Sequence, residues 1–310
     1  MMQDTVENMS SRPHSLRVWF TAARPHTLSA GVVPVLVGGA LAQSLGAFSP
    51  GLFALTLAGS VLVQVGANLT DEFADHGATA SAHKFPAPHK VIARGLLSQS
   101  QVRHGALAVF MLATFIGSFL VWRTGWELLA LCLASLAAAY FYSAGPRPLG
   151  DIALGEPLVF VMMGPVMVGG TLLVQLGGWQ AGPLASAMWF SLPVGALVTA
   201  ILVGNNLRDE DEDRKNGRRT LVTVLGAGLM LGGYYFLLAL AFAVPALSLV
   251  WGWSGPTLLL PWLTLPLAVG AGRLVGTRGR RDVQHRGLKA TSGLHAVFGL
   301  LLAAGLLLDT

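Results

Sequence analysis

Charged residues are scarce in this chain: Asp, Glu, Lys and Arg make up 11% of its 310 residues, whereas 53% are hydrophobic. Soluble proteins carry roughly 25% charged residues, so the composition excludes an ordinary water-soluble enzyme and a disordered chain. It also argues against nucleic-acid binding, despite a formal net charge of +5. Cysteine is almost absent, and the single Cys132 excludes a disulfide framework and a cysteine-based zinc site.

Long apolar runs account for this composition. A helix that crosses a bilayer needs about 20 mostly apolar residues, and nine segments approach that length. We therefore predict an all-α integral membrane bundle of about nine transmembrane helices, with residues 1–26 as a polar cytoplasmic leader and residues 27–310 as a single multi-spanning domain. The predicted spans are 27–47, 51–70, 105–122, 126–143, 152–175, 186–206, 221–246, 256–276 and 290–308.

The basic residues fall almost entirely on one side of this arrangement. Every Lys and Arg except Arg123 lies in a segment on the same side as the N-terminus. Cytoplasmic loops of membrane proteins carry an excess of Lys and Arg, so the pattern predicts a cytoplasmic N-terminus. It also supports the count of nine, because one helix more or fewer between the basic loops would break the pattern.

Two acidic segments of the chain resemble each other. Residues 65–75 read VGANLTDEFAD and residues 203–213 read VGNNLRDEDED, with seven of eleven positions identical at a constant offset of 138. The copies end the second and sixth predicted helices, and this even separation places both at the same membrane face. We predict a parallel internal repeat, with halves at roughly 27–143 and 152–276.

Helical geometry gathers the acidic side chains within each copy, because positions i, i+3, i+4 and i+7 share one face. The copies differ at the other positions, and there we predict Asp211 and Glu212 to be solvated charges. The shared faces carry Asn68, Asp71, Glu72 and Asp75 in the first copy, and Asn206, Asp209, Glu210 and Asp213 in the second.

These faces predict a magnesium site. Carboxylates at a helix C-terminus repel one another and the negative end of the helix dipole, and a divalent cation removes that cost. Mg²⁺ usually takes one or two carboxylates together with phosphate oxygens. The alternative is a pair of solvated acidic edges neutralised by nearby Lys and Arg. The predicted metal ligands are Asp71, Glu72, Asp75, Asp209 and Asp213.

Basic residues beside the acidic segments fit a diphosphate substrate, since cationic side chains and magnesium carboxylates together bind phosphate oxygens. Any one of them also serves the cytoplasmic excess of positive charge. The basic side chains predicted to lie near the diphosphate are Lys90, Arg94, Arg208, Lys215 and Arg219.

Further motifs surround the two acidic segments: RPHTL at 24–28, KVIARGLLS at 90–98, YSAGPRPLG at 142–150, LGE at 154–156 and NNLRDEDEDRKNGRRTL at 205–221. Together they resemble the UbiA superfamily of membrane prenyltransferases, closest to its 1,4-dihydroxy-2-naphthoate polyprenyltransferase branch. The chain departs from that branch at Asp71–Glu72, where the branch usually reads Asn–Asp.

The resemblance implies nine transmembrane helices around a cavity open to the cytoplasmic side and to the lipid bilayer. It implies magnesium-dependent transfer of a polyprenyl group from polyprenyl diphosphate to an aromatic acceptor, 1,4-dihydroxy-2-naphthoate. The acceptor loses its carboxylate, and the product leads to menaquinone at a bacterial-type plasma membrane. The positions that match the family's two metal and diphosphate motifs are Asn68, Asp71, Glu72 and Asp75, then Asn206, Asp209 and Asp213, and Lys90 matches a basic residue near the diphosphate.

Three further side chains receive roles in this interpretation. Tyr142 is expected to shield the allylic cation with its ring face, the alternative being a tyrosine at the membrane interface. Arg24 and His26 are candidates to hold the acceptor, the alternative being an anchor beside the membrane. His295, an ionisable group within the last predicted span, has no assigned role.

Two other functions remain open at this point. A prenyltransferase for another aromatic acceptor, such as 4-hydroxybenzoate, differs only in its acceptor pocket. A non-catalytic membrane transporter also uses parallel repeats.

Overall fold

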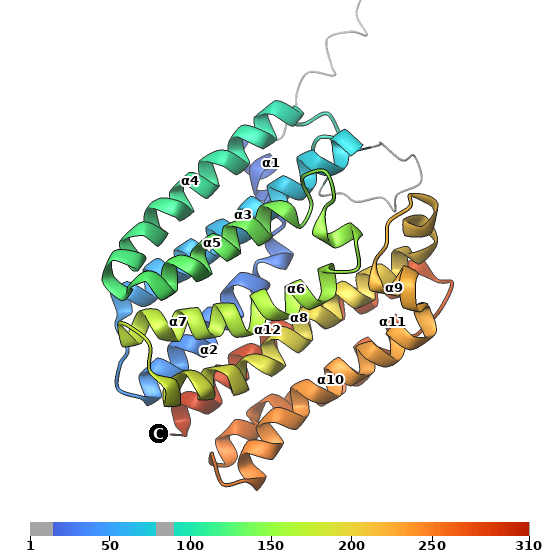
Figure 1. Ribbon diagram of the computed structural model, residues 1–310. Coiled ribbons are helices and arrows are strands. Elements are labelled where there is room, and N and C mark those ends of the chain that lie inside the picture. The colour runs from blue at the N-terminus through green and yellow to red at the C-terminus, as the bar shows by residue number, and fades with distance from the viewer. Residues whose placement is uncertain (1–14, 79–89, 310) are drawn as a thin grey trace, which may run out of the picture.

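The computed structural model describes residues 15–78 and 90–309, without the side chains of Ser15 and of residues 75–78. Most of the predicted leader, residues 1–14, therefore lies outside the described residues, as does the side chain of Asp75. The secondary-structure elements in the described part are helices, which run side by side in one bundle (Figure 1).

The bundle contains long helices and several short helical pieces. The long ones are α2 (Ser29–Ser44), α3 (Pro50–Ala78), α4 (Gln99–Thr124), α5 (Trp126–Phe141), α8 (Ala181–Lys215), α10 (Ala227–Val250), α11 (Leu265–Val275) and α12 (Arg281–Leu308). The short ones are α1 (Ser15–Ala22), η1 (Pro25–Thr27), η2 (Leu149–Asp151), α6 (Gly155–Val161), the π-helical η3 (Met162–Val166), α7 (Met167–Leu176), α9 (Leu221–Leu225) and η4 (Pro256–Thr264).

Eight helical segments in the described part are long and apolar enough to cross a membrane, which makes the chain a multi-pass integral membrane protein. The predicted span 126–143 is the apolar helix α5, whose 16 residues fall short of the other eight. The eight are Pro25–Ser44, Pro50–Ala74, Gln99–Thr124, Gly155–Leu176, Ala181–Lys215, Ala227–Val250, Pro256–Val275 and Arg281–Leu308.

Several helix boundaries differ from the predicted spans. α3 and α8 continue to Ala78 and Lys215, so both acidic segments are helical throughout. Polar residues do not end a helix, because its hydrogen bonds run along the backbone. The predicted span 221–246 instead breaks at Gly226, whose φ of 89° lies in the region that favours glycine. Thr220 caps the short α9 before this break by accepting a hydrogen bond from the Thr223 amide.

At the centre of the bundle, the backbone of α8 lies in close contact with the backbone of the α6–η3 segment. A Cβ atom at Gly195 of α8 would lie 2.8 Å from the carbonyl oxygen of Phe160 in α6, and one at Gly164 would lie 3.0 Å from the Cα of Gly195. The π turn between α6 and α7 contains Gly164 and Pro165, and proline is a common cause of such irregular turns. Glycine at this crossing lets α8 pass directly against the α6–η3 segment.

The elements follow one another in the order that the predicted repeat calls for. α2, α3, α4 and α5 are followed by α6–α7, α8, α9–α10 and η4–α11, in which each acidic segment ends the second member. α3, α4 and α5 lie together on one side of the bundle, α10 and α11 lie on the other, and α2, α7, α8 and α12 lie between them (Figure 1). The main core occupies this central part, with Val37, Leu172, Leu197 and Phe298 completely buried.

The predicted polar leader contains an ordered helix. α1 buries Val18 and Ala22 against Leu69 of α3 and Val91 in a separate small core. This packing places the chain segment that follows α1, which includes Arg24, next to the acidic end of α3.

Candidate functional site

One large cavity runs through the bundle and contains both acidic segments. Its volume is about 2130 Å³. We call the part lined by carboxylates its acidic end. Asp71 and Glu72 contribute to the acidic end from α3, and Asp209, Glu212 and Asp213 contribute from α8. The rest of the cavity is mainly apolar, with such residues as Val63, Ile116, Leu129, Leu133 and Met167.

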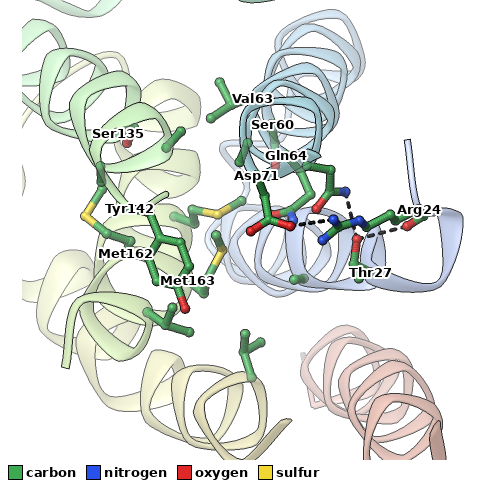
Figure 2. Close-up of a pocket in the computed structure, with 18 of the residues that line it drawn as sticks. Arg24, Thr27, Ser60, Val63, Gln64, Asp71, Ser135, Tyr142, Met162 and Met163 are labelled. Carbon is green, nitrogen blue, oxygen red and sulfur yellow. Dashed lines mark hydrogen bonds and ion pairs between the residues drawn. The ribbon is translucent and has the colours of Figure 1, made fainter. Parts of the chain in front are cut away.

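On α3, Asp71 is surrounded by hydrogen-bond donors. It forms an ion pair with Arg24, and the Lys90 ammonium lies 3.3 Å from the same oxygen. The Ser143 hydroxyl donates to the other oxygen at 3.3 Å. Figure 2 shows Asp71 between Arg24 and Tyr142. Segments far apart in the sequence therefore converge on this carboxylate.

Glu72 is the most deeply buried of these carboxylates, with 1% of its side chain exposed. Its Oε1 accepts a hydrogen bond from the backbone amide of Ile92 at 3.0 Å. Its Oε2 has no hydrogen-bond donor, although Arg24 and Lys90 lie 3.7 and 3.9 Å away. The segment after residue 89 is thus attached to α3 through this side chain.

On α8, Asp209 lies between two arginines. It pairs with Arg208, its neighbour in the chain, and it accepts from Arg281 of α12 at 2.7 Å. Arg281 also donates to Glu212 at 3.0 Å. These contacts connect the end of α8 to the beginning of α12.

Asp213 has a different partner. Arg218 donates to it at 3.1 Å and also to Asp151 at 2.6 Å. The backbone amide of Arg219 donates to the Asp151 carbonyl, beside a short bridge between Ile152 and Arg219. The connection between α5 and α6 is therefore fastened to the loop that follows α8.

The asparagines of the two segments are held in the same way. Asn68 donates its amide hydrogens to the Ala23 carbonyl at 2.8 Å and to the Thr27 hydroxyl at 2.9 Å. Asn206 donates to Glu156 at 2.9 Å. Thr27 precedes α2 and Glu156 begins α6, so the partners occupy corresponding places in the two halves. Because each amide nitrogen is engaged by the protein, each amide oxygen remains for the cavity.

Tyr142 caps the C-terminus of α5 and lines the cavity. The following loop closes around it, so that a Cβ atom at Gly150 would lie 3.1 Å from the Tyr142 carbonyl oxygen. Burial raises the pKa of the Tyr142 phenol, and the negative charge of Asp71 adds to this effect. The hydroxyl is therefore a neutral hydrogen-bond donor at physiological pH.

The cavity brings together most of the residues that the sequence predicted. Lys215 is not among them: it is exposed at the end of α8 and lines a separate, smaller pocket. The side chain of Asp75 lies outside the described residues. The predicted residues that line the cavity are Arg24, His26, Asn68, Asp71, Glu72, Lys90, Arg94, Tyr142, Asn206, Arg208, Asp209 and Asp213.

Two predictions about α8 are wrong. Glu212, expected to be solvated, is buried and paired with Arg281. Glu210, expected on the shared acidic face, pairs with Arg214 and does not line the cavity among its described residues. The face that meets the cavity carries positions 209, 212 and 213, which share a side of a helix at spacings of three and four. Asp211 is exposed, as predicted.

Sequence reasoning missed several residues of the site. Glu156 belonged to a recognised motif but had no assigned role, and its contact with Asn206 depends on how the halves pack. Arg218, Arg281 and Lys289 looked like ordinary members of the cytoplasmic positive charge. Only the tertiary structure distinguishes them: Arg218 and Lys289 line the cavity, and Arg281 pairs with Asp209, which also lines it.

The carboxylates fit Mg²⁺ as oxygen donors. No three Asp, Glu, His or Cys side chains in the described part lie close enough to hold a metal ion as they stand. The acidic side chains pair with Arg and Lys instead. Oε2 of Glu72, Oε1 of Glu212 and Oδ2 of Asp213 are nevertheless buried without a hydrogen-bond donor. Such oxygens are hard ligands that suit Mg²⁺ when phosphate oxygens complete its shell.

The fold and this cavity define a multi-pass membrane protein with a charged end to an apolar pocket. The model of the UbiA prenyltransferase family matches residues 31–307. The chain therefore belongs to the UbiA prenyltransferase family, and it is a prenyltransferase. The predicted family and enzyme class are confirmed, which leaves the alternative of a non-catalytic transporter without support.

Curated relatives match nearly the whole chain. The 1,4-dihydroxy-2-naphthoate octaprenyltransferase of Bacillus subtilis is 29% identical over 94% of this chain and 93% of its own length. The protein of that name from Escherichia coli is 32% identical over 84% of this chain and 85% of its own. The mouse UbiA prenyltransferase domain-containing protein 1 is 29% identical over 97% of this chain and 88% of its own.

Solved structures share the fold at lower identity. A UbiA homolog from Aeropyrum pernix K1 has a TM-score of 0.66 at 16% identity, over 89% of this chain and 97% of that chain. A UbiA homolog from Archaeoglobus fulgidus bound to DMAPP and Mg²⁺ has a TM-score of 0.57 at 13% identity, over 92% of this chain and 99% of that chain. These similarities confirm the UbiA-like helical fold.

Proposed function

We propose that this protein transfers a polyprenyl group from polyprenyl diphosphate to 1,4-dihydroxy-2-naphthoate, with loss of the acceptor carboxylate, in menaquinone biosynthesis. The proposal rests on one observation: the acidic ends of α3 and α8, with the cations that pair with them, meet at one end of a large, mainly apolar cavity. The bacterial relatives named 1,4-dihydroxy-2-naphthoate octaprenyltransferase support this acceptor.

The acidic end would hold the diphosphate. Asp71, Glu72, Asp209 and Asp213, with the predicted Asp75, are the side chains that would hold Mg²⁺. Bound Mg²⁺ supplies Lewis-acid chemistry at the leaving group. The cations now paired with these carboxylates would gain phosphate oxygens as additional partners. The cations concerned are Arg24, Lys90, Arg208, Arg218 and Arg281.

These residues would favour cleavage of the allylic C–O bond. Negative charge grows on the diphosphate as the bond breaks, and fixed guanidinium and ammonium groups stabilise it without reorganising. The aromatic carbon of the acceptor then forms a bond to the allylic carbon, diphosphate departs with the electron pair of the C–O bond, and the ring regains its aromaticity as the carboxylate leaves as CO2. Tyr142, which lines the cavity near Asp71, would face the developing cation with its ring.

The apolar part of the cavity would hold the isoprenoid chain and exclude water. The side chains of Met162 and Met163 line it and lie near Tyr142 in the view of Figure 2. Methionine is flexible and adapts to irregular apolar ligands. Exclusion of water protects an allylic cation from hydrolysis, and a cavity inside a membrane bundle provides that protection.

We further propose that α5 is the ninth transmembrane helix and that the N-terminus is cytoplasmic, in a bacterial-type plasma membrane. All basic residues except Arg123 then share the cytoplasmic side. A helix of 16 residues spans about 24 Å, which a locally thinned bilayer accommodates.

The experiment uses membranes that contain the protein, a polyprenyl diphosphate, Mg²⁺ and a panel of acceptors including 1,4-dihydroxy-2-naphthoate and 4-hydroxybenzoate. Mass spectrometry detects the product. We expect prenylated, decarboxylated naphthoate, and its loss with a chelator or with Asp209→Asn. Asp211→Asn is the matched control, because Asp211 is exposed on the same helix.

Each outcome has a definite meaning. Product from another acceptor alone would preserve the prenyl-transfer chemistry and overturn the menaquinone assignment. Equal loss of product in both aspartate variants would show that Asp209 has no special role.

A further inference from the structure

Lys289 differs from the other cationic side chains of the cavity. Arg24, Lys90, Arg208 and Arg218 each form an ion pair with a carboxylate of the acidic end. Lys289 of α12 lines the same cavity, yet it has no hydrogen bond and no ion pair within the part of the chain that the structure describes. It lies within a helix that is a candidate membrane span. An ionisable residue in such a helix usually marks a functional site.

Two histidines lie within electrostatic range of Lys289. His285 precedes it by one turn of α12, and His26 belongs to η1 at the start of the α2 span. Both line the same cavity. His285 also lies 3.2 Å from Arg208, measured from Nδ1 to Nη1. Lys289 is the cation of this group, and its ammonium and the two imidazoles together form a small set of hydrogen-bonding groups, which we call the α12 cluster.

Open space lies beside the α12 cluster. The next residues of α12 on the cavity side are Ser292, Gly293 and Ala296, all of them small. A Cβ atom built on Gly293 would meet no atom within 4 Å. The helix therefore offers a low, weakly polar surface next to the ammonium group, and a flat ring fits such a surface.

Of the α12 residues in the cluster, His285 lies beside Arg208 at the acidic end, and Lys289 lies one turn of the helix further along. Arg281, at the start of α12, is the residue that pairs with Asp209. Lys289 follows it by eight positions, which is about 12 Å along a helix. A diphosphate held by Asp209 and Asp213 would not extend that far, so the cluster has room for a second anionic group.

We propose that Lys289, with His26 and His285, binds the carboxylate of the aromatic acceptor, whose ring lies against the small residues of α12. This inference rests on the proposed function, because it requires an acceptor with a carboxylate. Lys289 is exposed where it meets the cavity, so its ammonium is open to an incoming carboxylate, and such a pair forms a charge-assisted hydrogen bond. Arg24, which the sequence also suggested for the acceptor, forms an ion pair with Asp71.

The test compares two acceptors in the purified full-length protein. One is 1,4-dihydroxy-2-naphthoate, and the other is 1,4-dihydroxynaphthalene, which lacks the carboxylate and is measured as a substrate or as a competitive inhibitor. In Lys289→Met, we expect KM for the naphthoate to rise about 10- to 100-fold, as for the loss of a charged hydrogen bond. The KM or inhibition constant for dihydroxynaphthalene and the KM for polyprenyl diphosphate should stay within about twofold of their values in the unmodified protein. Lys289→Arg should recover part of the naphthoate affinity.

Two further variants control for folding and position. Arg286→Met removes an exposed cation from the same helix, outside the described lining of the cavity, and should leave all three constants unchanged. Gly293→Ala narrows the proposed ring surface and should raise the constants for both acceptors, with an unchanged melting temperature.

Several results would overturn the inference. A rise in KM for polyprenyl diphosphate in Lys289→Met would assign the ammonium to the diphosphate. An equal rise in the constants for both acceptors would show that Lys289 does not act on the carboxylate. If Lys289→Met does not fold, an unaltered acceptor affinity in a stable Gly293→Ala would overturn the inference. Failure of the unmodified protein to prenylate the naphthoate would instead refute the proposed function.

Discussion

The contact between Glu156 and Asn206 gives a sharp prediction about metal use. Asn206 donates to Glu156 at 2.9 Å, and both side chains are buried, with 3% and 6% of their surfaces exposed. Glu156→Leu keeps much of the side-chain volume and removes the acceptor. The Asn206 amide group then either stays without a partner or rotates, which turns its nitrogen toward the proposed Mg²⁺ site.

The expected magnitude follows from the cost of an unsatisfied buried donor, about 1–3 kcal/mol. We therefore expect Glu156→Leu to require about 10- to 100-fold more Mg²⁺ for half-maximal prenyl transfer. Glu156→Gln retains an acceptor oxygen and should stay within about threefold of the unmodified protein. The rate as a function of Mg²⁺ concentration measures the effect, and the rise in melting temperature with Mg²⁺ and diphosphate measures it without turnover.

A double mutant separates positioning from general damage. If Glu156 acts through Asn206, Glu156→Leu should add little to Asn206→Ala, because effects of residues in contact are not additive. Full additivity would refute the reasoning. An unchanged Mg²⁺ requirement in Glu156→Leu, or equal impairment by Glu156→Gln, would refute it as well.

Three further predictions follow from the structure. Burial raises the pKa of Tyr142 above its ordinary value, so the phenol stays protonated. Tyr142→Phe should therefore leave the shape of the pH–rate profile between about pH 7 and 9.5 unchanged. An inflection in this range that the variant loses would contradict this. A Cβ atom at Gly299 would lie 2.1 Å from Val33 Cγ1, so Gly299→Ala should cost about 1–3 kcal/mol of stability and lower the melting temperature, whereas Gly293→Ala should not. Lys215→Gln should change kcat/KM by less than about twofold, because Lys215 is exposed and lines a separate pocket; a large loss would restore its predicted role in substrate binding.

The predicted repeat would account for the two similar but unequal halves of the site. Asn68 and Asn206 are held by residues at corresponding places, Thr27 and Glu156. Further along each segment the halves diverge, since Glu72 lies inside the cavity and Glu210 faces away from it. Helix packing around α8 differs from that around α3, so identical sequence positions meet different surroundings.

The class of fold follows from the order of residues alone. Bilayer thickness requires long apolar helices, and backbone groups in lipid must be satisfied within each helix, so apolar runs are readable without tertiary structure. Helical periodicity likewise indicated that Asp209 and Asp213 would share a face, and the even number of predicted helices between the acidic segments placed Asp71 at the same side of the membrane. Apolar runs and helical faces depend on the spacing of residues along the chain, so both can be read from the sequence.

Which charges line the cavity depends on how the helices pack against one another. Glu212 and Asp211 are neighbours in the chain, yet one is buried and the other exposed. Arg281 lies 72 positions from the aspartate that it pairs with, and Lys289 became a candidate only because α12 directs it into the cavity. Burial and pairing depend on which helices pack together, and that arrangement is a property of the whole bundle.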